Sequence, residues 1–384
     1  MKKLAIFAEA LTGGGVENIL QTILKHWDYT NFDVTLYTIR DIPLPECLSG
    51  LPIKHRFIFE SGNGARVSRI RVWWKNKLRL LIYYHCQPKT FYRLFIRTHF
   101  DAALAFLEGF ATRIVSGAPS SVKRIAWLHC DIINHHWTRI AYRSDQEERE
   151  SYRAFDSVVC VSPGVQEQLL KLYGKDLRTR VILNPIDRDD ILKKAKAESA
   201  SYDIIPAGAI RLISLGRLVP IKGYDRLIRV ARRLFDDGCN FFLSILGGGN
   251  ERNHLQTLIN ENNLNARVSL LGHKENPYPY LNASDIYVCS SFSEGYNTAI
   301  AEALVLGKAV VSTDCMKEND LLGESEFGFV VDNSEDGLYS GLKQMMQPHV
   351  MEKYSDYARE RGARLGVNNS LRELYSLIDL LLSR

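Results

Sequence analysis

Residues 293–303 read Ser293-Glu294-Gly295-Tyr296-Asn297-Thr298-Ala299-Ile300-Ala301-Glu302-Ala303 and lead from an apolar, strand-like run into a helical pattern. Outward from this stretch, apolar runs of strand length alternate with amphipathic stretches of helix length. The alternation covers residues 1–185 and begins again at Arg211. It predicts parallel sheets with helices on both faces, and therefore an α/β chain with two doubly wound sheets.

Each half of the chain supplies a set of strand candidates. In the first half they are residues 3–8, 34–37, 102–106, 124–128, 157–161 and 180–183. In the second half they are residues 211–215, 241–246, 268–270, 286–289, 309–312 and 328–331.

The length also favours two domains. At 384 residues the chain exceeds what one hydrophobic core usually supports. A polar stretch, residues 187–209, leads through lysines and serines to Pro206, where we place the boundary. The prediction is an N-terminal domain of residues 1–205 and a C-terminal domain of residues 206–367. Residues 368–384 have apolar positions at helical spacing and predict a terminal helix, for which the simpler interpretation is that it caps its own domain.

Composition limits the classes of protein. No apolar run approaches the ~18 residues that a membrane span needs, and Glu9 interrupts the N-terminal apolar run before a signal peptide would be complete. The seven cysteines are odd in number and form no close pair in the sequence. This pattern indicates reduced thiols and hence a cytoplasmic protein.

The net charge of +5 is unevenly distributed. Residues 1–205 carry 30 Lys and Arg against 22 Asp and Glu, which gives +8, and the remainder carries 19 against 22, which gives −3. Nine cations and no acid lie between Arg66 and Arg97, interleaved with Trp73, Trp74 and several Leu and Tyr. This pattern suits an anionic membrane surface, where each Lys or Arg contributes about 1 kcal/mol. Nucleic acid would attract the same charge, but no nucleic-acid-binding motif occurs elsewhere, so none is expected as a partner. The alternative is ordinary core with a solvated cationic rim.

Glu294 and Glu302 form a pair of carboxylates within the opening stretch. On one helix they would lie about 12 Å apart along the axis, too far to share a proton but suited to the two ends of an extended ligand such as a nucleotide sugar. Glu294 would meet the hexose and Glu302 the ribose. The alternative is that Glu294 caps a helix start and Glu302 is a solvated helix residue.

Three glycine-containing turns follow predicted strands. The first places Gly14 and Gly15 before a helix whose free N–H groups suit a phosphate or sugar oxygen. In the second, Arg217 can bind two phosphate oxygens and Lys222 adds a point charge, so that together they offset a diphosphate. The third begins at Gly247 and resembles the wall of a nucleotide-base site. Each is also compatible with an ordinary surface turn.

In this order the segments resemble the family 4 glycosyltransferases, which are retaining enzymes of the GT-B fold. The resemblance spans nearly the whole chain and is strongest over residues 270–314. It is carried there by Leu271-Gly272-His273, the strand at 285–289, the Glu294 and Glu302 pair, and Gly307-Lys308-Ala309-Val310-Val311-Ser312-Thr313-Asp314. Trp127-Leu128-His129-Cys130-Asp131 matches the family's strand-end histidine. Asn184-Pro185-Ile186-Asp187 is similar to a variant in transferases that build bacterial capsule, exopolysaccharide or O-antigen units.

The resemblance implies two Rossmann-like domains that face a cleft, with the C-terminal helix crossing back to the first domain. The first domain would bind the acceptor and face the membrane, and the second would bind the donor. The implied donor-binding residues are Gly14, Gly15, Arg217, Lys222, Gly247, His273, Glu294, Asn297, Thr298, Ala299 and Glu302. The implied catalytic residues are His129, Arg217, Lys222 and Glu294. Tyr296-Asn297 stands where the family often has Phe followed by Gly or Pro, which changes the expected hexose contacts.

No metal is expected. Asp187-Arg188-Asp189 has the Asp-x-Asp spacing with which other transferases bind a divalent cation, but it follows a proline at a predicted helix start, where Asp is a common N-cap. The histidines at 129, 135 and 136 match no zinc spacing. The family fold that the chain resembles uses no catalytic metal.

The implied reaction transfers a hexosyl unit from a nucleoside diphosphate sugar, with UDP favoured over GDP, to a hydroxyl of a lipid-linked saccharide on the inner face of the cell membrane. Retention at the anomeric carbon ordinarily calls for a carboxylate nucleophile, and the sequence offers no obvious one. This favours a front-face path in which the departing phosphate accepts the acceptor's proton. The alternatives are a soluble enzyme of the same fold on a small acceptor, a nucleotide-sugar epimerase, and a catalytically silent scaffold.

Overall fold

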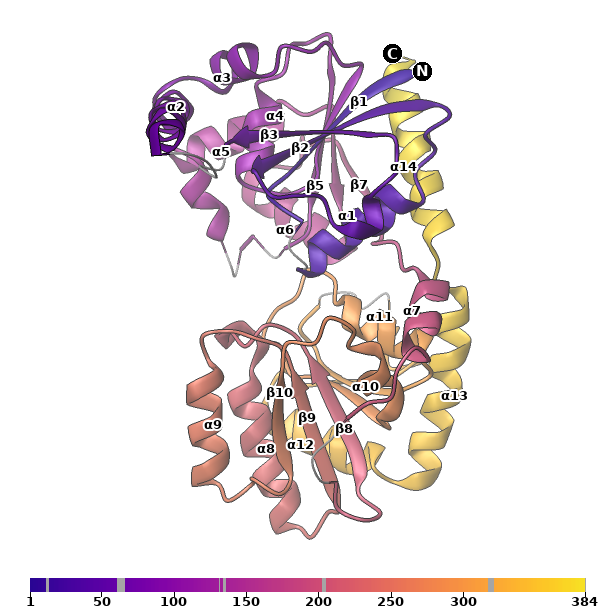
Figure 1. Cartoon of the computed structure of the whole chain (residues 1–384). Helices are drawn as coiled ribbons and strands as arrows, with labels where there is room; N and C mark the ends of the chain where they lie inside the picture. The colour runs from indigo at the N-terminus through magenta and orange to yellow at the C-terminus, as the bar shows by residue number, and fades with distance from the viewer. Residues whose placement is uncertain are drawn as a thin grey trace. The chain divides into compact units, whose positions relative to one another are not determined.

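The computed structural model describes residues 1–11, 14–60, 66–130, 132–133, 136–201, 205–316 and 321–383. The chain divides into two compact units (Figure 1). The first contains Met1–Pro185 together with Val367–Arg384, and the second contains Ile186–Gly366.

The first unit is built on a seven-stranded parallel sheet with the order β3-β2-β1-β4-β5-β6-β7. The strands are β1 Lys2–Ala8, β2 Phe32–Arg40, β3 Ile53–Phe59, β4 Ala102–Ala105, β5 Lys123–Leu128, β6 Ser157–Cys160 and β7 Thr179–Val181. The α-helices are α1 Gly15–Lys25, α2 Arg66–His85, α3 Pro88–Phe95, α4 Phe110–Ser116, α5 Asp145–Arg153, α6 Pro163–Tyr173 and α14 Val367–Leu382. The central strands read as continuous apolar runs because both faces of the sheet are covered.

The second unit repeats this plan with six parallel strands in the order β10-β9-β8-β11-β12-β13. The strands are β8 Ile210–Leu215, β9 Phe241–Leu246, β10 Val268–Gly272, β11 Ile286–Cys289, β12 Ala309–Thr313 and β13 Phe329–Val331. The α-helices are α7 Arg188–Ala195, α8 Tyr224–Asp236, α9 Arg252–Glu261, α10 Tyr278–Ala283, α11 Thr298–Val305, α12 Glu335–Met345 and α13 Pro348–Arg364.

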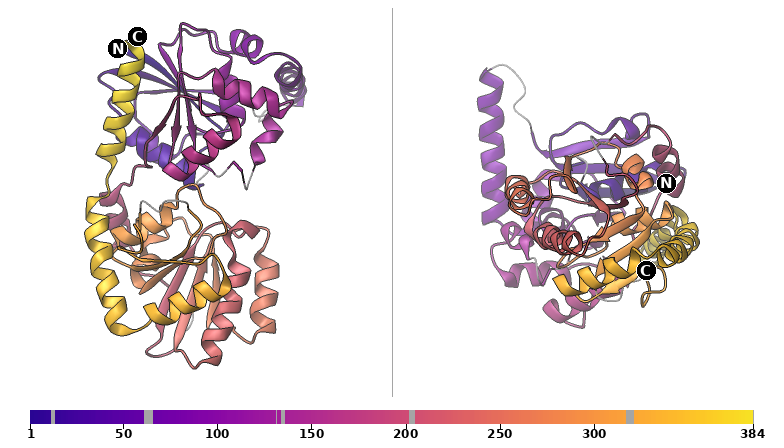
Figure 2. Two further views of the ribbon diagram at one scale, coloured as in Figure 1. Left: turned by 180° about the vertical axis from the view of Figure 1, so that it is seen from behind. Right: turned by 90° about the horizontal axis from the view of Figure 1, so that it is seen from below.

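Two apolar clusters cover the two faces of the second sheet. One joins the strands to α8, α9 and α12, and the other joins them to α7, α10, α11 and α13. Alternate residues of one strand serve opposite faces: in β11, Ile286 and Val288 belong to the first cluster and Tyr287 and Cys289 to the second. The sequence-based prediction of two doubly wound parallel sheets is therefore confirmed (Figures 1 and 2).

All twelve strand candidates correspond to strands of the two sheets, with small differences at their ends. The strand that the sequence analysis missed is β3, which reads IKHRFIF and lies at the edge of the first sheet. Of its residues only Ile58 is fully buried, so the segment has polar residues where a central strand has apolar ones. An edge strand buries little and leaves only a weak apolar signal.

The domain boundary lies 20 residues earlier than predicted, after Pro185 rather than near Pro206. Residues 186–205, which we assigned to the first domain, belong to the second unit. The reason is apolar packing: Ile186 and Ile191 are buried in the core of the second unit, where α7 contacts α10 and α11. The lysines of this stretch lie on the outside of a short amphipathic helix rather than in a linker.

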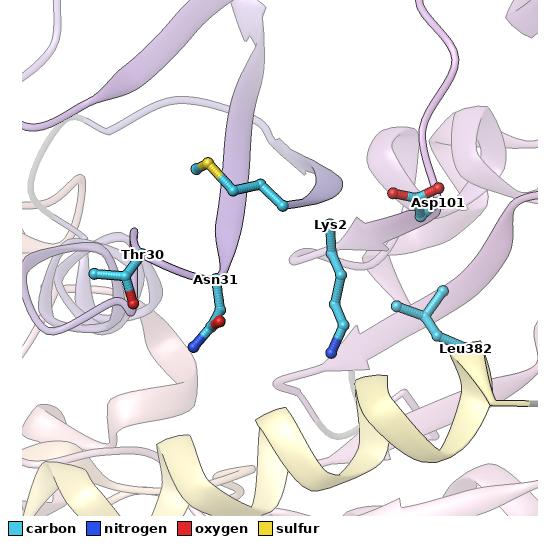
Figure 3. A pocket seen from close by; sticks show the side chains of 6 residues that line it. Lys2, Thr30, Asn31, Asp101 and Leu382 are labelled. Carbon is cyan, nitrogen blue, oxygen red and sulfur yellow. The ribbon is translucent and has the colours of Figure 1, made fainter.

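The C-terminal helix α14 packs on the first unit, as the resemblance implied. Tyr375 stacks on Phe32 at a centroid distance of 5.6 Å, and its hydroxyl accepts a hydrogen bond from the Asp28 backbone N–H at 2.8 Å. Lys2 forms an ion pair with Asp379. Beside this contact, a shallow hollow of about 470 Å³ is lined by Met1, Lys2, Thr30, Asn31, Asp101 and Leu382 (Figure 3).

Helix α2 contains most of the basic and aromatic segment singled out in the sequence. Figure 2 shows it as a long helix at the margin of its unit. Ile70, Trp73, Trp74 and Leu78 each expose more than half of their surface, so these residues are not core. Tyr83 is the exception, because it is buried against Phe91 and α4. Within the part of the chain that the structure describes, no helix is both long and apolar enough to cross a bilayer.

Candidate functional site

Both sheets have the strand order in which the direction of winding reverses at the centre. The reversal lies between β1 and β4 in the first unit and between β8 and β11 in the second. In open α/β sheets, ligands bind beyond the carboxyl ends of the strands at such a switch point. The loops that follow β8 and β11 contain Lys222 and Glu294, so these two predicted site residues flank the switch point of the second sheet.

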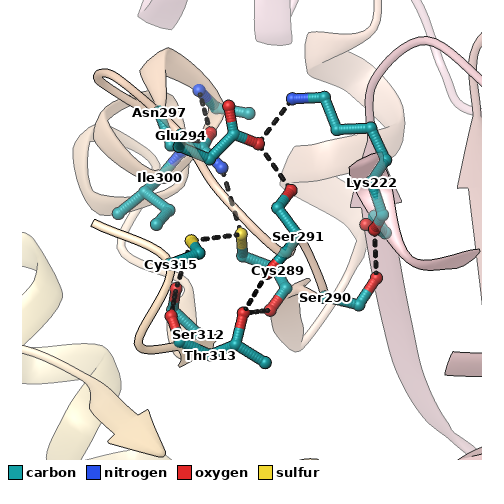
Figure 4. Close-up of polar contacts among 12 residues, drawn as sticks. Lys222, Cys289, Ser290, Ser291, Glu294, Asn297, Ile300, Ser312, Thr313 and Cys315 are labelled. Atoms are coloured by element: carbon teal, nitrogen blue, oxygen red, sulfur yellow. Dashed lines mark hydrogen bonds and ion pairs between the residues drawn. The ribbon is translucent and has the colours of Figure 1, made fainter. Parts of the chain in front are cut away.

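Lys222 and Glu294 form an ion pair across this switch point (Figure 4). The Lys222 Nζ donates to Glu294 Oε1 at 2.6 Å, and the Ser291 hydroxyl donates to the same oxygen. Both charged side chains are largely buried, with 20% and 13% of their surfaces exposed. The carboxylate raises the pKa of Lys222 against the opposing effect of burial.

A buried arginine, Arg226, holds the loop that carries Glu294. Its guanidinium donates to the carbonyl oxygen of Ser290 at 2.6 and 2.8 Å and to that of Ser291 at 2.7 Å. A further bond reaches Asn333 Oδ1 at 2.8 Å, and the group lies 3.8 Å from the centre of the Phe292 ring. Arg226 lies in α8, which begins at Tyr224 just after Lys222. This helix therefore holds the Glu294 loop through the backbone carbonyl groups of the loop.

Close backbone approach at this point requires Gly223. Its φ of +62° lies in the left-handed region, and a Cβ at this position would stand 2.3 Å from the Ser290 carbonyl oxygen. The Ser290 hydroxyl in turn donates to the Lys222 carbonyl oxygen at 2.8 Å. The loops after β8 and β11 thus pack against each other, and Lys222 and Glu294 are in contact although 72 positions separate them in the sequence.

Asn297 begins helix α11 as its N-cap. Its Oδ1 accepts from the backbone N–H of Ala299 at 3.1 Å and of Ile300 at 3.3 Å. The N–H of Ala299, which the resemblance assigned to the hexose, therefore already has a partner in the side chain of Asn297. The helix N-terminus still directs its positive dipole end toward the loop of Glu294.

Glu302 lies one turn into α11, on the side that faces α10. The Tyr278 hydroxyl donates to its Oε1 at 3.3 Å. Burial raises the pKa of Glu302 to about 7, although the Tyr278 hydroxyl and Lys194 act in the opposite direction. The solvated-residue alternative for Glu302 is not what the structure shows, because its side chain is only partly exposed and accepts the hydrogen bond from Tyr278.

The other predicted donor-site residues of the second unit lie on neighbouring loops. Arg217 is exposed in the loop after β8, and His273 is exposed directly after β10. Gly247 follows β9, and a Cβ there would stand 1.8 Å from the Gly216 carbonyl oxygen. Glycine is therefore required at position 247 by the close contact between the loops after β8 and β9.

In the first unit, His129 lies at the carboxyl end of β5 with its ring against those of Phe106 and Trp127, at centroid distances of 4.8 and 5.7 Å. It is 7% exposed, and among the described residues neither ring nitrogen has a hydrogen-bond partner. Burial lowers the pKa of His129 to about 3, so the imidazole is neutral at physiological pH. The Glu108 carboxylate, whose own pKa is raised by burial, accepts the His129 backbone N–H at 3.1 Å.

The first glycine turn is described from Gly14 onward. Gly14 is the N-cap of α1, and its backbone N–H donates to Glu17 Oε2 at 2.9 Å. Gly15 is the first residue of the helix. The N–H of Gly14 is therefore occupied by a carboxylate of its own helix.

The interpretation of Asp187 as a helix cap is confirmed. Its side chain accepts the Asp190 backbone N–H at 3.1 Å at the start of α7. Within the described ranges, no three His, Cys, Asp or Glu side chains gather as metal ligands would. Of the three histidines considered for zinc, His135 lies outside the described residues, and His136 bonds to Glu148.

Several site residues escaped the sequence analysis. Ser290 and Ser291 precede the quoted stretch and carry no signal of their own, since serine is common in loops. Arg226 looks like any of the arginines of α8. The helical pattern of α8 does give one signal that Arg226 is buried. Residue 226 lies one turn before Val230, which is buried together with Leu227 on the face of α8 that meets the core.

Comparisons with known proteins place each half of the chain in a family. Residues 202–361 match the family "Glycosyl transferases group 1", and residues 13–190 match the family "Glycosyltransferase Family 4".

Curated relatives are similar over the whole chain or over part of it. The N-acetylgalactosamine-N,N'-diacetylbacillosaminyl-diphospho-undecaprenol 4-alpha-N-acetylgalactosaminyltransferase of Campylobacter jejuni is 28% identical over 375 residues, which cover 94% of this chain and 95% of that protein. The lipopolysaccharide core biosynthesis glycosyltransferase LpsE of Rhizobium meliloti is 30% identical over 210 residues, covering 54% of this chain and 59% of that protein.

Solved structures share the fold over the full length. Anabaena HepE, crystallised with UDP and glucose, superposes with a TM-score of 0.74 at 17% identity and covers 99% of this chain and 100% of its own. Sucrose-phosphate synthase from Thermosynechococcus elongatus gives a TM-score of 0.76 at 16% identity and covers 100% of both chains. With two Rossmann-like sheets and a matching family on each half, the protein contains a family 4 glycosyltransferase domain followed by a group 1 glycosyltransferase domain and has the GT-B fold.

Proposed function

We propose that the protein is a retaining hexosyltransferase that uses a nucleoside diphosphate sugar, with UDP favoured, and transfers the sugar to a hydroxyl of a lipid-linked saccharide in bacterial surface-polysaccharide synthesis. The observation that carries the proposal is the Lys222 and Glu294 pair at the switch point of the second sheet. It places a cation suited to a diphosphate beside a carboxylate suited to sugar hydroxyls.

Two comparisons support the choice of donor and acceptor. The Campylobacter relative is named as an N-acetylgalactosaminyltransferase whose acceptor is a saccharide on diphospho-undecaprenol. The HepE structure contains UDP and glucose. The second unit would accordingly bind the donor, with Glu302 on the ribose, Glu294 on the hexose, and Gly247 and His273 bordering the base.

In this mechanism the residues act mainly on the leaving group. As the glycosidic bond breaks, negative charge develops on the diphosphate, and Lys222, Arg217 and the N-terminal dipole of α11 stabilise it. Lys222 is already oriented by Glu294 and needs no rearrangement of the loop to act. The phosphate oxygen then accepts the proton of the attacking hydroxyl on the same face of the sugar, which gives retention without a protein nucleophile.

His129 is proposed to contact the sugar through a neutral ring. With its pKa near 3, the imidazole offers one donor and one acceptor rather than a charge. It would therefore orient a sugar hydroxyl, and it would not stabilise the oxocarbenium-like carbon as a charged group. Gly14 and Gly15 are proposed to approach the same diphosphate from the first unit, and no metal is proposed to take part.

Helix α2 is proposed to hold the protein on the inner face of the cell membrane. Lys77 Nζ lies 4.8 Å above the Trp73 ring and 5.4 Å from the Trp74 ring, so a cation and two exposed aromatic rings form one cluster. Arg71 is exposed on the same helix, whereas Arg79 bonds to the Ile58 carbonyl oxygen and to Glu60 and belongs to the fold. A helix with these side chains suits an anionic headgroup layer.

The donor is tested by thermal unfolding with UDP, GDP, ADP and their sugars, because selective binding to the folded form raises the midpoint. A shift with UDP and a larger one with one UDP-sugar are expected. Glu294→Ala should remove the additional shift from the sugar but retain that from UDP, and it should abolish transfer with the fold intact. No shift with any nucleotide would favour a silent scaffold.

Reaction class and retention are tested on the product. Transfer to a lipid-linked acceptor, with the anomeric configuration read by NMR, should give the configuration of the donor. An altered UDP-sugar in the absence of acceptor would indicate an epimerase, and transfer only to small saccharides would exclude the lipid-linked acceptor.

The membrane proposal is tested with vesicles of anionic and of zwitterionic lipid. Arg71→Glu with Lys77→Glu should weaken binding to anionic vesicles by roughly 2 to 4 kcal/mol, or about 30-fold or more. The control is Lys171→Glu with Lys175→Glu, which makes the same charge change on exposed residues of the same unit. Equal loss in both double variants, or no loss in either, would refute a docking role for α2.

A further inference from the structure

Two buried cysteines lie together beneath the loop of Glu294. Cys289 ends β11 and Cys315 follows β12, and their Sγ atoms are 3.7 Å apart (Figure 4). The sequence separates them by 26 positions, so the spacing gave no sign of a pair. Their residues are 2% and 7% exposed, and both thiols are reduced.

Each cysteine has a direct contact with the residues that the donor site needs. The backbone N–H of Glu294 donates to the carbonyl oxygen of Cys315 at 2.9 Å. The side-chain N–H of Asn297 donates to Cys289 Sγ at 3.1 Å, while its Oδ1 caps α11. The two cysteines therefore support both ends of the short loop from Glu294 to Asn297, Cys315 through its backbone carbonyl and Cys289 through its thiol.

The two thiols differ in acidity. A hydrogen bond from the Cys315 thiol lowers the pKa of Cys289, and the same sharing raises the pKa of Cys315. Asn297 adds a second donor to Cys289 Sγ. The thiolate is the nucleophile in thiol oxidation, so Cys289 is the member of the pair that reacts first.

We propose that Cys289 and Cys315 are a redox modification site, at which a hydroperoxide forms a reversible disulfide that displaces the Glu294 loop. The effect on donor binding rests on the function proposed above, whereas the disulfide and the displacement do not.

The oxidation balances in two steps. The Cys289 thiolate attacks hydrogen peroxide, the O–O bond breaks, and sulfenic acid and hydroxide form. The Cys315 thiol then attacks the sulfenic sulfur, the S–O bond breaks, and a disulfide and water form. Dithiothreitol returns both thiols by exchange.

Closure of the disulfide requires movement of the loop. A disulfide has an S–S length of about 2.05 Å, so the sulfurs must approach by about 1.6 Å from their separation of 3.7 Å. The sulfur of Cys289 also becomes a poorer acceptor for Asn297. Because Cys315 holds the Glu294 backbone, we expect the shift to reach the carboxylate that pairs with Lys222.

The experiment treats the full chain with hydrogen peroxide, blocks free thiols and maps cross-linked peptides by mass spectrometry. Hydrogen exchange of the amides at residues 290–300 is then compared between the reduced, oxidised and re-reduced protein. A link between Cys289 and Cys315 is expected, with faster exchange in this segment that dithiothreitol reverses. Cys315→Ser should show neither change, and Cys160→Ser should behave as the wild type, since Cys160 is a buried thiol on β6.

Absence of the link, or a link without any change in exchange, would overturn the proposal. The apparent donor affinity, measured from the donor-dependent rise in the unfolding midpoint, should fall at least tenfold on oxidation. An unchanged affinity would overturn the effect on the donor site. If the reduced protein binds no nucleotide, the proposed function fails, while the mapped link and the exchange data still decide the modification site.

Discussion

Replacement of Glu302 by glutamine should change how stability depends on pH. The Glu302 carboxyl extends from α11 to the Tyr278 hydroxyl of α10, and burial raises its pKa from 4.5 to about 7. In the unfolded chain it ionises at the lower value. Between these two values the folded state holds a proton that the unfolded state has lost, so stability falls as the pH rises.

The size of the effect follows from the shift. A difference of about 2.5 pKa units corresponds to about 3 kcal/mol, which is present below the unfolded pKa and lost once the pH passes the folded value. Between about pH 5 and about pH 7.5 the wild type should lose about 2 kcal/mol from this group. Glu302→Gln removes the titration, so the variant should gain about 2 kcal/mol relative to the wild type over the same interval.

The assay is denaturant unfolding of both proteins at a series of pH values. The difference between the two proteins isolates Glu302, because buried Glu108 and His129 titrate alike in both. Donor affinity provides a second readout: an ionised carboxylate accepts two ribose hydroxyls, so affinity of the wild type should rise through about pH 7 and that of Glu302→Gln should not.

Parallel stability curves for the wild type and Glu302→Gln would refute the reasoning, since they would mean that the carboxyl titrates equally in the folded and unfolded chains. A difference that grows in the opposite direction, with the variant losing stability as the pH rises, would mean that Glu302 is stabilised as an anion. In that case a cation, and not burial, would control it.

Three further variants test the same assembly. Tyr278→Phe removes the hydroxyl that lowers the pKa of Glu302, so the loss of stability should extend to higher pH, and an unchanged profile would contradict the hydrogen bond. Lys222→Met leaves Glu294 with Ser291 as its partner. The substitution should lower the free energy of unfolding by up to about 3 kcal/mol and should also weaken donor binding. Full stability of the variant would show that the ion pair is not formed in solution. Arg226→Gln should lower the free energy of unfolding by about 3 kcal/mol and reduce transfer. Arg226→Lys should restore little of this stability, because an ammonium group cannot reproduce the planar guanidinium. Full stability with lysine would show that the positive charge alone matters.

Much of the fold could be predicted from the sequence because the central strands of a covered sheet are continuous apolar runs. Strands such as β9, in which all six residues are buried, leave a signal that needs no tertiary information. The signal fails at the margins. The edge strand β3 exposes most of its residues, and α7 joins the second unit through two isoleucines within a lysine-rich stretch.

The site was predictable only in part. Glu294, Glu302 and Lys222 were singled out by residue chemistry and then by the resemblance, and the structure brings Lys222 and Glu294 into contact. Arg226 could not be distinguished from Arg229, Arg232 and Arg233 by residue type, although it alone of the four is almost fully buried. The only local signal is its position on the buried stripe of α8, since the Ser290 and Ser291 carbonyl groups that it bonds lie more than 60 residues away.

The two units share a strand order but differ at their switch points, and this difference favours the second unit as the donor-binding one. Beyond β8 and β11, a lysine and a carboxylate meet within 2.6 Å, and the N-terminus of α11 adds a positive dipole end. At the corresponding edge of the first sheet, the amide of Gly14 is occupied by Glu17 and the imidazole of His129 is neutral. A diphosphate needs compensating positive charge when it leaves water, whereas saccharide hydroxyls need only hydrogen-bond partners. Because Lys222 lies in the second unit, we expect nucleotide affinity to respond to substitutions there, and substitutions at His129 to act mainly on the rate of transfer.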